Sequence, residues 1–522
     1  MKKIAKFLIV LGMIGQLSSC DYLDIVPDER AQESDTWKTE GAVRGYLYSC
    51  YGYLPANRTF GNSYWLAEEL TAVTKELFTT FKYGYYSPVS LGFTSNTWST
   101  IWNGIHQCYM FQESLKQVSN EYVTDEMKKQ YLAESNFLIA YYHFLSMRSY
   151  GPTMIIRSVI DLETPISGFP ERSSIDEVVA FINEKLDEAM SEGGLPTTWS
   201  GKDYGRATRL AALALKSRVY LYAASPLYNG NTEMYADFRS PLDGRQLIAQ
   251  EKSQAKWEIS ATQTKYAIDE VEKAKFHLYH DADAGEPSDA KPGLPNKAQR
   301  RLRYTNIDNQ TGNNPEIIWA DTRNDDYYGI QRRCPPRQTL GGKFAGISMT
   351  NCPTLQTIEA FYTKNGLPIN KDKTFDYDER YEYISAPENC DGNNYEDLVK
   401  YANFTPSSDK VMRLCTDREP RFYAWTTYHN GYFEFGKYNN EEISADPAKR
   451  AIRIHLLRDD PHGRGNRTDQ EYSISGFGNK KGVVPSAEWN VIEYPFPLFR
   501  LAELYLNYAE ALVELDRLSE AK

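Results

Sequence analysis

The segment from Ala207 to Ala224 constrains the fold more than any other part of the chain. It reads Ala-Thr-Arg-Leu-Ala-Ala-Leu-Ala-Leu-Lys-Ser-Arg-Val-Tyr-Leu-Tyr-Ala-Ala and stops just before Pro226. Alanine and leucine favour a helix, and a helix that is apolar on most of its circumference packs on several sides. The chain therefore needs other helices to cover this one.

Helical periodicity predicts those other helices. Ser174 and Glu177 are spaced as a capping box at the start of one of them. Gly151-Pro152 is a sharp stop at the end of another. The predicted helical segments are 37–51, ending near Pro55; 98–118; 124–150; 174–190; 207–224; 253–276; and a helical hairpin over 497–522.

Pairs of these helices form hairpins of roughly 35 to 50 residues, which is typical of degenerate tetratricopeptide-type repeats. Residues 279–496 differ: they are rich in Gly, Pro, Asn and Tyr, with short strand-like runs such as 315–320. We therefore expect a mainly α fold, in which a helical scaffold over 32–278, with a binding loop inserted at about 75–97, carries an irregular, loop-rich subdomain over 279–496. The hairpin over 497–522 returns to the scaffold, and the lack of a stop signal after it leads us to expect a truncated C-terminus.

The first twenty residues have the pattern of a lipoprotein signal. A basic start is followed by an apolar run too short to span a bilayer, and then by Leu17-Ser18-Ser19-Cys20. We expect residues 1–19 to be removed, Cys20 to carry the lipid, and 20–31 to form a tether. Attachment through more than one acyl chain gives stable anchoring.

Charge and cysteine content narrow the choice of function. The chain has 59 Lys and Arg against 70 Asp and Glu, which argues against nucleic-acid binding. Apart from Cys20, six cysteines remain in a compartment that permits oxidation. We favour Cys334–Cys352 as a disulfide that closes a loop, although buried thiols are an equal alternative.

Motifs for common catalytic and metal sites are missing from the sequence. There is no Gly-x-Ser-x-Gly, His-Glu-x-x-His, Cys-x-x-Cys or phosphate loop. His277 and His280 are three apart, but two ligands do not make a metal site. The spacing of the acidic residues does not support calcium, so no cofactor is predicted. A pair of hydrolytic carboxylates stays open, since only their separation in space would identify it.

Aromatic residues are abundant, with 39 tyrosines and 9 tryptophans, partly in loops. Flat rings with a polar edge suit sugar rings, which present C–H faces bordered by hydroxyls. Packing of loop against scaffold is an equal alternative for these clusters. Four tryptophans with regular periodicity, Trp98, Trp102, Trp257 and Trp319, are assigned to the core instead. The candidate ligand-binding residues are Phe81, Lys82, Tyr83, Tyr85 and Tyr86 in one cluster and Tyr327 and Tyr328 in a second.

Several segments, in order from 20 to about 515, together resemble the SusD/RagB family of outer-membrane nutrient-binding lipoproteins of Bacteroidetes. They include Cys20-Asp21-Tyr22-Leu23-Asp24, Gly41-Ala42-Val43-Arg44-Gly45-Tyr46, Ala133-Glu134-Ser135-Asn136-Phe137, Gly205-Arg206-Ala207-Thr208, Ser225-Pro226-Leu227-Tyr228-Asn229-Gly230, Asn314-Pro315-Glu316-Ile317-Ile318-Trp319, Arg418-Glu419-Pro420-Arg421-Phe422 and Phe499-Arg500-Leu501-Ala502-Glu503-Leu504.

The resemblance implies a repeat-containing helical fold at the outer face of the outer membrane. It also implies a SusC-like TonB-dependent transporter as partner, which the protein would cover as a lid. Glycan binding in such proteins uses loops that correspond in place to Phe81–Tyr86 and to Tyr327-Tyr328.

From residues and resemblance together, we predict a non-enzymatic protein that captures a glycan and delivers it to the transporter. Two rivals stand beside this prediction. A glycoside hydrolase would depend on two acidic residues about 5–10 Å apart. A repeat scaffold or peptide-binding lid would have no glycan affinity.

Overall fold

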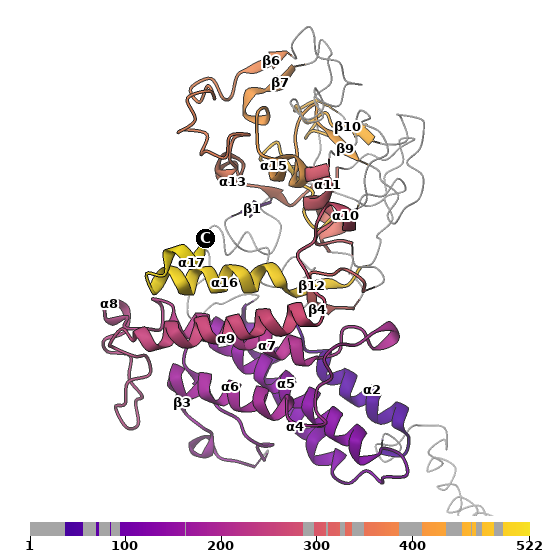
Figure 1. Cartoon of the computed structure of the whole chain (residues 1–522), viewed down its shortest axis with the longest axis vertical. Helices are drawn as coiled ribbons and strands as arrows, with labels where there is room; N and C mark the ends of the chain where they lie inside the picture. The colour runs from indigo at the N-terminus through magenta and orange to yellow at the C-terminus, as the bar shows by residue number, and fades with distance from the viewer. Residues whose placement is uncertain are drawn as a thin grey trace, which may run out of the picture.

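The computed structural model describes a helical scaffold and a set of loop-rich segments that lie beyond it (Figure 1). The residues described are 37–55, 69–72, 84, 94–161, 163–284, 297–308, 312–323, 329–336, 349–385, 410–434, 451–460, 462–465, 472–484 and 494–522. All structural statements below refer to these residues.

The scaffold helices begin and end where their sequences change. Thr39, Thr124 and Thr208 each cap a helix by accepting a hydrogen bond from a backbone N–H three residues later. Ser174 and Glu177 form the predicted capping box. Gly151, with φ of 72°, ends a helix in a conformation that other residues rarely adopt. The main scaffold helices are α2 (Glu40–Tyr51), α4 (Thr94–Leu115), α5 (Asp125–Tyr150), α6 (Ile175–Ala189), α7 (Arg209–Ala224), α9 (Gln254–Lys273) and α16 (Leu501–Glu514).

Each of these helices packs on a neighbour in the scaffold. The strongest contacts join α4 to α5, α5 to α6, α7 to α9 and α9 to α16, and α2 lies on α4. Figure 1 shows α16 lying along α9, although the whole loop-rich part of the chain separates them in sequence. The mainly helical fold predicted from periodicity is therefore confirmed.

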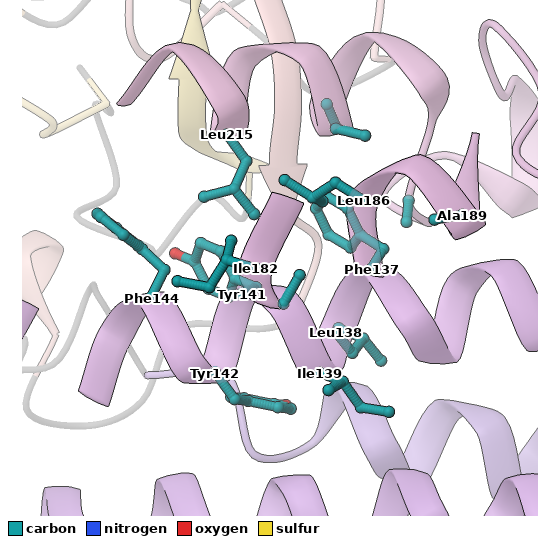
Figure 2. Close-up of a cluster of buried hydrophobic side chains, with 14 of the residues drawn as sticks. Phe137, Leu138, Ile139, Tyr141, Tyr142, Phe144, Ile182, Leu186, Ala189 and Leu215 are labelled. Atoms are coloured by element: carbon teal, nitrogen blue, oxygen red, sulfur yellow. The ribbon is translucent and has the colours of Figure 1, made fainter. Parts of the chain in front are cut away.

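Helix α5 is the centre of the scaffold core. Its residues from Phe137 to Met147 are all buried, so the helix is covered on every side. Side chains from α6, including Ile182 and Leu186, and Leu215 of α7 pack around it (Figure 2). A helix enclosed in this way needs no polar face, which explains why α5 and α7 lack a clear alternation of apolar and polar sides.

A buried ion pair links three parts of the scaffold. Glu134 of α5 has no exposed surface, and its Oε1 lies 2.5 Å from Nη2 of Arg206. Tyr51 donates a hydrogen bond to the same carboxylate at 2.6 Å and accepts one from the backbone N–H of Ala207. Burial raises the pKa of Glu134, whereas these hydrogen bonds oppose the rise. The partners of this carboxylate also fix α2 and the start of α7 against α5.

The segment before α16 corrects one prediction. Residues 497–500 were expected to begin a helix, but they belong to strand β12 (Phe496–Arg500), which pairs antiparallel with β4 (Ile317–Asp321). In place of the predicted helix, Phe499 packs its ring on Trp319, with centroids 5.7 Å apart, and Trp319 meets Phe137 of α5. Burial of these rings outweighs the helical pattern of the residues that follow.

Short elements make up the rest of the described chain. They are β1 (Leu70–Thr71), β2 (Thr153–Met154), β3 (Arg172–Ser173), α8 (Thr232–Tyr235), α10 (Asp281–Ala284), α11 (Lys297–Tyr304), α12 (Ile330–Arg333), β5 (Cys352–Pro353), α13 (Leu355–Ala360), β6 (Tyr383–Ser385), β7 (Lys410–Met412), α15 (Pro420–Trp425), β8 (Thr426–Thr427), β9 (Tyr432–Glu434), β10 (Ala451–Arg453), β11 (Gly478–Asn479) and α17 (Leu518–Ala521). The strands occur in two-stranded pairs: β1 with β5, and likewise β2–β3, β6–β7, β8–β11 and β9–β10. A second hydrophobic cluster, around Ile358, Leu414 and Phe422, is separate from the scaffold core.

The predicted disulfide between Cys334 and Cys352 is wrong. Both sulfurs are buried thiols. Cys352 Sγ donates to the carbonyl of Thr71 at 3.6 Å, and Asn479 donates to Cys334 Sγ at 3.4 Å. Each thiol is therefore fixed by a different element, and the prolines that follow both residues in sequence did not indicate a pairing.

The four tryptophans assigned to the core divide into two groups. Trp257 and Trp319 are buried. Trp98 and Trp102 are only half-buried, and on α4 their rings make an edge-to-face contact with centroids 5.3 Å apart.

None of the described helices is long and apolar enough to cross a membrane.

Candidate ligand-binding site

A cavity of about 380 Å³ lies where β12 and β1 meet the loop-rich segments. Its walls come from both the N-terminal and the C-terminal parts of the chain. The lining residues are Glu69, Leu70, Asn306, Pro353, Thr357, Phe361, Trp425, Thr426, Asn479, Lys481, Gly482, Tyr494, Phe496, Pro497 and Arg500. Aromatic rings with a few polar groups among them are typical of a small-molecule binding site.

Trp425 and Lys481 form the most distinctive pair in this cavity. The Lys481 ammonium lies 4.6 Å from the centre of the indole ring, within range of a cation–π contact. Trp425 is half-buried, and its Nε1 donates to the carbonyl of Leu302 at 3.2 Å, which fixes the ring. Lys481 is partly exposed, but the surrounding protein removes water from its ammonium group. This desolvation, together with the positive charge of the neighbouring Arg500, lowers the pKa of Lys481.

Other lining residues of the cavity are also fixed. Asn479 accepts a hydrogen bond from the backbone N–H of Lys481 at 3.1 Å. Tyr494 is buried and donates its hydroxyl to the carbonyl of Gly482 at 2.8 Å. Gly482 has φ of 76°, and a Cβ there would lie 2.9 Å from the side chain of Ile330. Only glycine fits this turn without strain, so the wall is preformed.

Charged groups in the cavity do not form a hydrolytic pair. Glu69 is the single carboxylate among the described lining residues. Arg500 is bound to Glu316, with 2.8 Å between Nη1 and Oε1. Two carboxylates on either side of a bound sugar would be needed for glycoside hydrolysis. What this lining offers instead is ring faces and hydrogen-bonding groups, which hold a ligand without cleaving it.

The residues predicted from the sequence to bind ligand lie outside the described residues. This holds for Phe81, Lys82, Tyr83, Tyr85, Tyr86, Tyr327 and Tyr328, and also for the predicted lipid attachment at Cys20. Gly84, within the first cluster, is described: it is exposed and has φ of 71°. These candidates remain predictions.

The sequence analysis missed the cavity residues. Trp425 follows Phe422 and Tyr423, but this short aromatic run was not singled out, and Lys481 stands in a segment without a motif. A second local signal was the glycine of Lys480-Lys481-Gly482, because glycine often marks a tight turn. The other lining residues could not be grouped from the sequence, because they are spread along the chain from Glu69 to Arg500.

One group of side chains has metal-binding chemistry. His277 and His280, which the sequence left as two ligands, are joined by Asp283 beyond the end of α9. This group is separate from the cavity lining.

Comparison with known proteins agrees with this architecture. The family model described as "SusD family" matches residues 315–522, and the one described as "Starch-binding associating with outer membrane" matches residues 21–221. Among curated proteins, none matches the chain by sequence.

Solved structures give a continuous match across both regions. The protein BT4246 is 28% identical, with a TM-score of 0.75 over 93% of this chain and 80% of its own. A SusD-like protein from Bacteroides fragilis is 20% identical, with a TM-score of 0.62 over 95% of this chain and 78% of its own. A SusD-like carbohydrate binding protein, also from Bacteroides fragilis, is 17% identical, with a TM-score of 0.54 over 92% of this chain and 75% of its own. The last two show the fold alone.

The two family models match residues 21–221 and 315–522, and BT4246 matches 93% of the chain in a single alignment. The chain therefore belongs to the SusD/RagB family of outer-membrane-associated, glycan-binding proteins, which are not enzymes.

Proposed function

We propose that this protein is a lipid-anchored receptor at the cell surface, which captures an oligosaccharide or polysaccharide and delivers it to a SusC-like TonB-dependent transporter. The observation that carries the proposal is the cavity that contains Trp425, Lys481 and Asn479, a fixed ring face beside fixed hydrogen-bonding groups. A sugar ring stacks its C–H face on such a ring and directs its hydroxyls to the polar groups around it.

The predicted aromatic loops follow or precede, in sequence, described elements at or beside this cavity. The stretch from Thr71 of β1 to Phe81 spans at most about 35 Å. Tyr328 is two residues from Ile330, and so within about 7 Å of it along the chain. Ile330 packs against Gly482 of the cavity wall. Both loops therefore leave from elements that border one site, and we propose that they extend it.

The anchor and the partner rest on other features. The anchor follows from the run of basic, apolar and small residues that ends at Cys20. The transporter partner follows from family membership, since a receptor in this family would cover the transporter as a lid. Closing a lid over the transporter would commit the captured glycan to import.

Affinity electrophoresis tests glycan binding directly. The soluble form, starting after Cys20, is run through gels that contain different plant, microbial and host polysaccharides. Retardation in one of them identifies the class of ligand. Trp425→Ala should then weaken binding roughly 30-fold, equivalent to about 2 kcal/mol, because the ring is the fixed anchor of the cavity.

Matched variants distinguish the contribution of the cavity to glycan retention from that of the loops and from nonspecific effects of a substitution. Tyr85→Ala and Tyr86→Ala should also reduce retention, by less than Trp425→Ala if the loops only extend the site. Phe169→Ala is the control, since Phe169 is an exposed aromatic outside the cavity lining. Retention that survives Trp425→Ala would move the site away from this cavity. No retention on any polysaccharide, with or without the transporter, would contradict the proposal and favour a peptide cargo.

A further inference from the structure

The segment from His277 to Asp283 follows α9 and ends within α10. Its sequence is His-Leu-Tyr-His-Asp-Ala-Asp, so the two histidines and Asp283 follow one another at intervals of three residues. Both imidazoles are exposed, and Asp283 is half-buried. His277 and His280 precede α10, whereas Asp283 lies within it.

The structure brings the three side chains together. Asp283 Oδ1 lies 3.4 Å from Nε2 of His277, and Asp283 Oδ2 lies 2.9 Å from Nδ1 of His280. The two imidazole rings are stacked, with centroids 4.8 Å apart and planes inclined by 23°. One ligand atom from each residue lies within 4.8 Å of the other two. Among the described residues this is the single group of His, Cys, Asp and Glu that satisfies such a distance.

The backbone that carries these ligands is fixed from behind. The N–H of His277 donates to the carbonyl of Pro315 at 3.1 Å. The N–H of Tyr279 donates to Glu316 at 2.8 Å, and its buried ring is held by a hydrogen bond to Asp308. The two histidines therefore stand on either side of a residue that is anchored to the segment leading into β4. Such support lowers the entropy lost when ligands gather around an ion.

We infer that His277, His280 and Asp283 bind a divalent transition-metal ion such as Zn²⁺. Zinc takes imidazole nitrogen at about 2.0–2.1 Å and carboxylate oxygen at about 2.0–2.2 Å, so ligand atoms in a tetrahedral site lie roughly 3.3 Å apart. The present separations, up to 4.8 Å, need adjustments of at most about 1.5 Å, which exposed imidazoles make by rotation. Three protein ligands leave the fourth position to water.

The donor set disfavours the ions that prefer oxygen. Calcium and magnesium take carboxylates, carbonyls and water, whereas imidazole favours zinc, copper and nickel. The site therefore discriminates by ligand type and not by charge alone.

Asp283 also has a local structural role that the test must separate. Its Oδ2 accepts the backbone N–H of His280 at 2.9 Å, as the third residue of a helix does when its side chain reaches back to the N-cap backbone. One oxygen is enough for that role, whereas Oδ1 faces His277. Asp283→Asn keeps an acceptor for the backbone and removes the negative charge, so it weakens the metal site without removing the cap.

Titration calorimetry with Zn²⁺ tests the inference, on the mature chain purified without a histidine tag. One equivalent should bind to the parent and raise its Tm, because an ion that binds only the folded state stabilises it. Loss of a residue that merely orients a ligand costs about 10–100-fold in affinity. His277→Ala and His280→Ala remove direct ligands, so each should weaken binding by at least about 100-fold. Ca²⁺ should give no heat and no Tm shift.

Two controls make the result specific. His106→Ala removes an exposed histidine on α4, outside the group, and should bind Zn²⁺ as the parent does. A second group of histidines consists of His429, His455 and His462. His455→Ala tests whether this group binds Zn²⁺, although Nδ1 of His429 and Nδ1 of His462 already accept backbone hydrogen bonds. Unchanged binding in His277→Ala and His280→Ala, or no binding to the parent, would overturn the inference.

Discussion

His143 lies on α5 with no exposed surface, and its two nitrogens have different partners. Nδ1 donates to the carbonyl of Ile139 at 2.7 Å, and Nε2 accepts the N–H of Ile156 at 3.3 Å. This arrangement requires the neutral ring, because a proton on Nε2 would face another donor. Burial, assisted by the nearby cations Lys185 and Arg157, lowers the pKa of His143 to about 4.

A pH dependence of stability follows from that residue. Between about pH 6.5 and pH 4 the unfolded chain takes up a proton that the folded chain excludes. The contribution of His143 is thus fully present above pH 6.5 and is lost as pH falls toward 4. We expect acidification from pH 7.5 to 4.5 to remove about 2–3 kcal/mol of the free energy of unfolding through this group.

Urea unfolding at the two pH values measures the effect. His143→Gln does not titrate, so it should be less stable at neutral pH but lose less stability on acidification. His106→Gln, which changes an exposed histidine, should follow the parent at both values. Equal losses in His143→Gln and the parent would show that other groups cause the acid sensitivity.

At the scale of single elements, two glycines in helices α2 and α4 have opposite surroundings. Gly45 is in the middle of α2 and exposed, and a Cβ placed there would meet nothing within 4 Å. Gly104 is in α4, where a Cβ would lie 2.9 Å from the ring of Tyr142 and 3.0 Å from Cβ of Tyr53. Glycine at position 45 lowers the helix propensity of α2 without any packing benefit. Glycine at position 104 instead allows α4 to approach α5 closely.

Alanine at these positions should therefore act in opposite directions. Gly45→Ala is expected to stabilise the protein by about 0.5–1 kcal/mol. Gly104→Ala is expected to destabilise it by about 1–3 kcal/mol, because the added methyl group forces α4 and Tyr142 apart. Denaturant midpoints of the two variants measure the difference. Stabilisation by Gly104→Ala would mean that the α4–α5 interface has room that these distances do not show.

Elements with a local cause were predictable from the sequence. Thr124, Ser174 and Gly151 mark helix ends through contacts with nearby residues, and the structure places those ends close to the predicted ones. The start of α4 was less well predicted, since Thr94 precedes the apolar repeat that begins at Trp98. Strand β12 was missed because its partner β4 lies far earlier in the chain, and nothing in Phe-Pro-Leu-Phe-Arg announces that pairing.

Sites assembled from distant segments were not predictable in the same way. The aromatic runs that include Tyr83 and Tyr327 drew attention because they are contiguous, whereas Trp425 and Lys481 meet only through the fold. The His277–His280 pair was visible in sequence, but Asp283 joined it only once the turn after α9 was known. The predicted Cys334–Cys352 bond shows the reverse error, in which a sequence feature suggested a link that the fold does not make.

At the scale of the whole molecule, two of the hydrophobic clusters formed by the described residues differ in size and construction. The scaffold core runs through α5, α6 and α7 and includes Trp319 and Phe499. The second cluster, around Ile358 and Phe422, is small and is held by helices of six residues. The free energy of local opening follows buried apolar contact, so the two parts should open independently.

Native-state hydrogen exchange should show this difference. Amides of α5 and α7 are expected to exchange only through global unfolding, and amides of α13 and α15 through a smaller opening at low denaturant. Addition of a glycan that binds the cavity should slow exchange in α15 more than in α5, because Trp425 ends α15. Identical protection in all four helices would indicate one cooperative unit instead.

Helix α16 covers α7 and α9, and Glu503 of α16 binds Arg218 of α7 across 285 residues of chain. Ribosomes add about 5–20 residues per second. Roughly 15–60 seconds therefore pass between the synthesis of Arg218 in α7 and that of Glu503 in α16, which covers it. During that interval the scaffold lacks one wall of its interior and is open to wrong partners. The scaffold is therefore complete only after the last helices of the chain have been made.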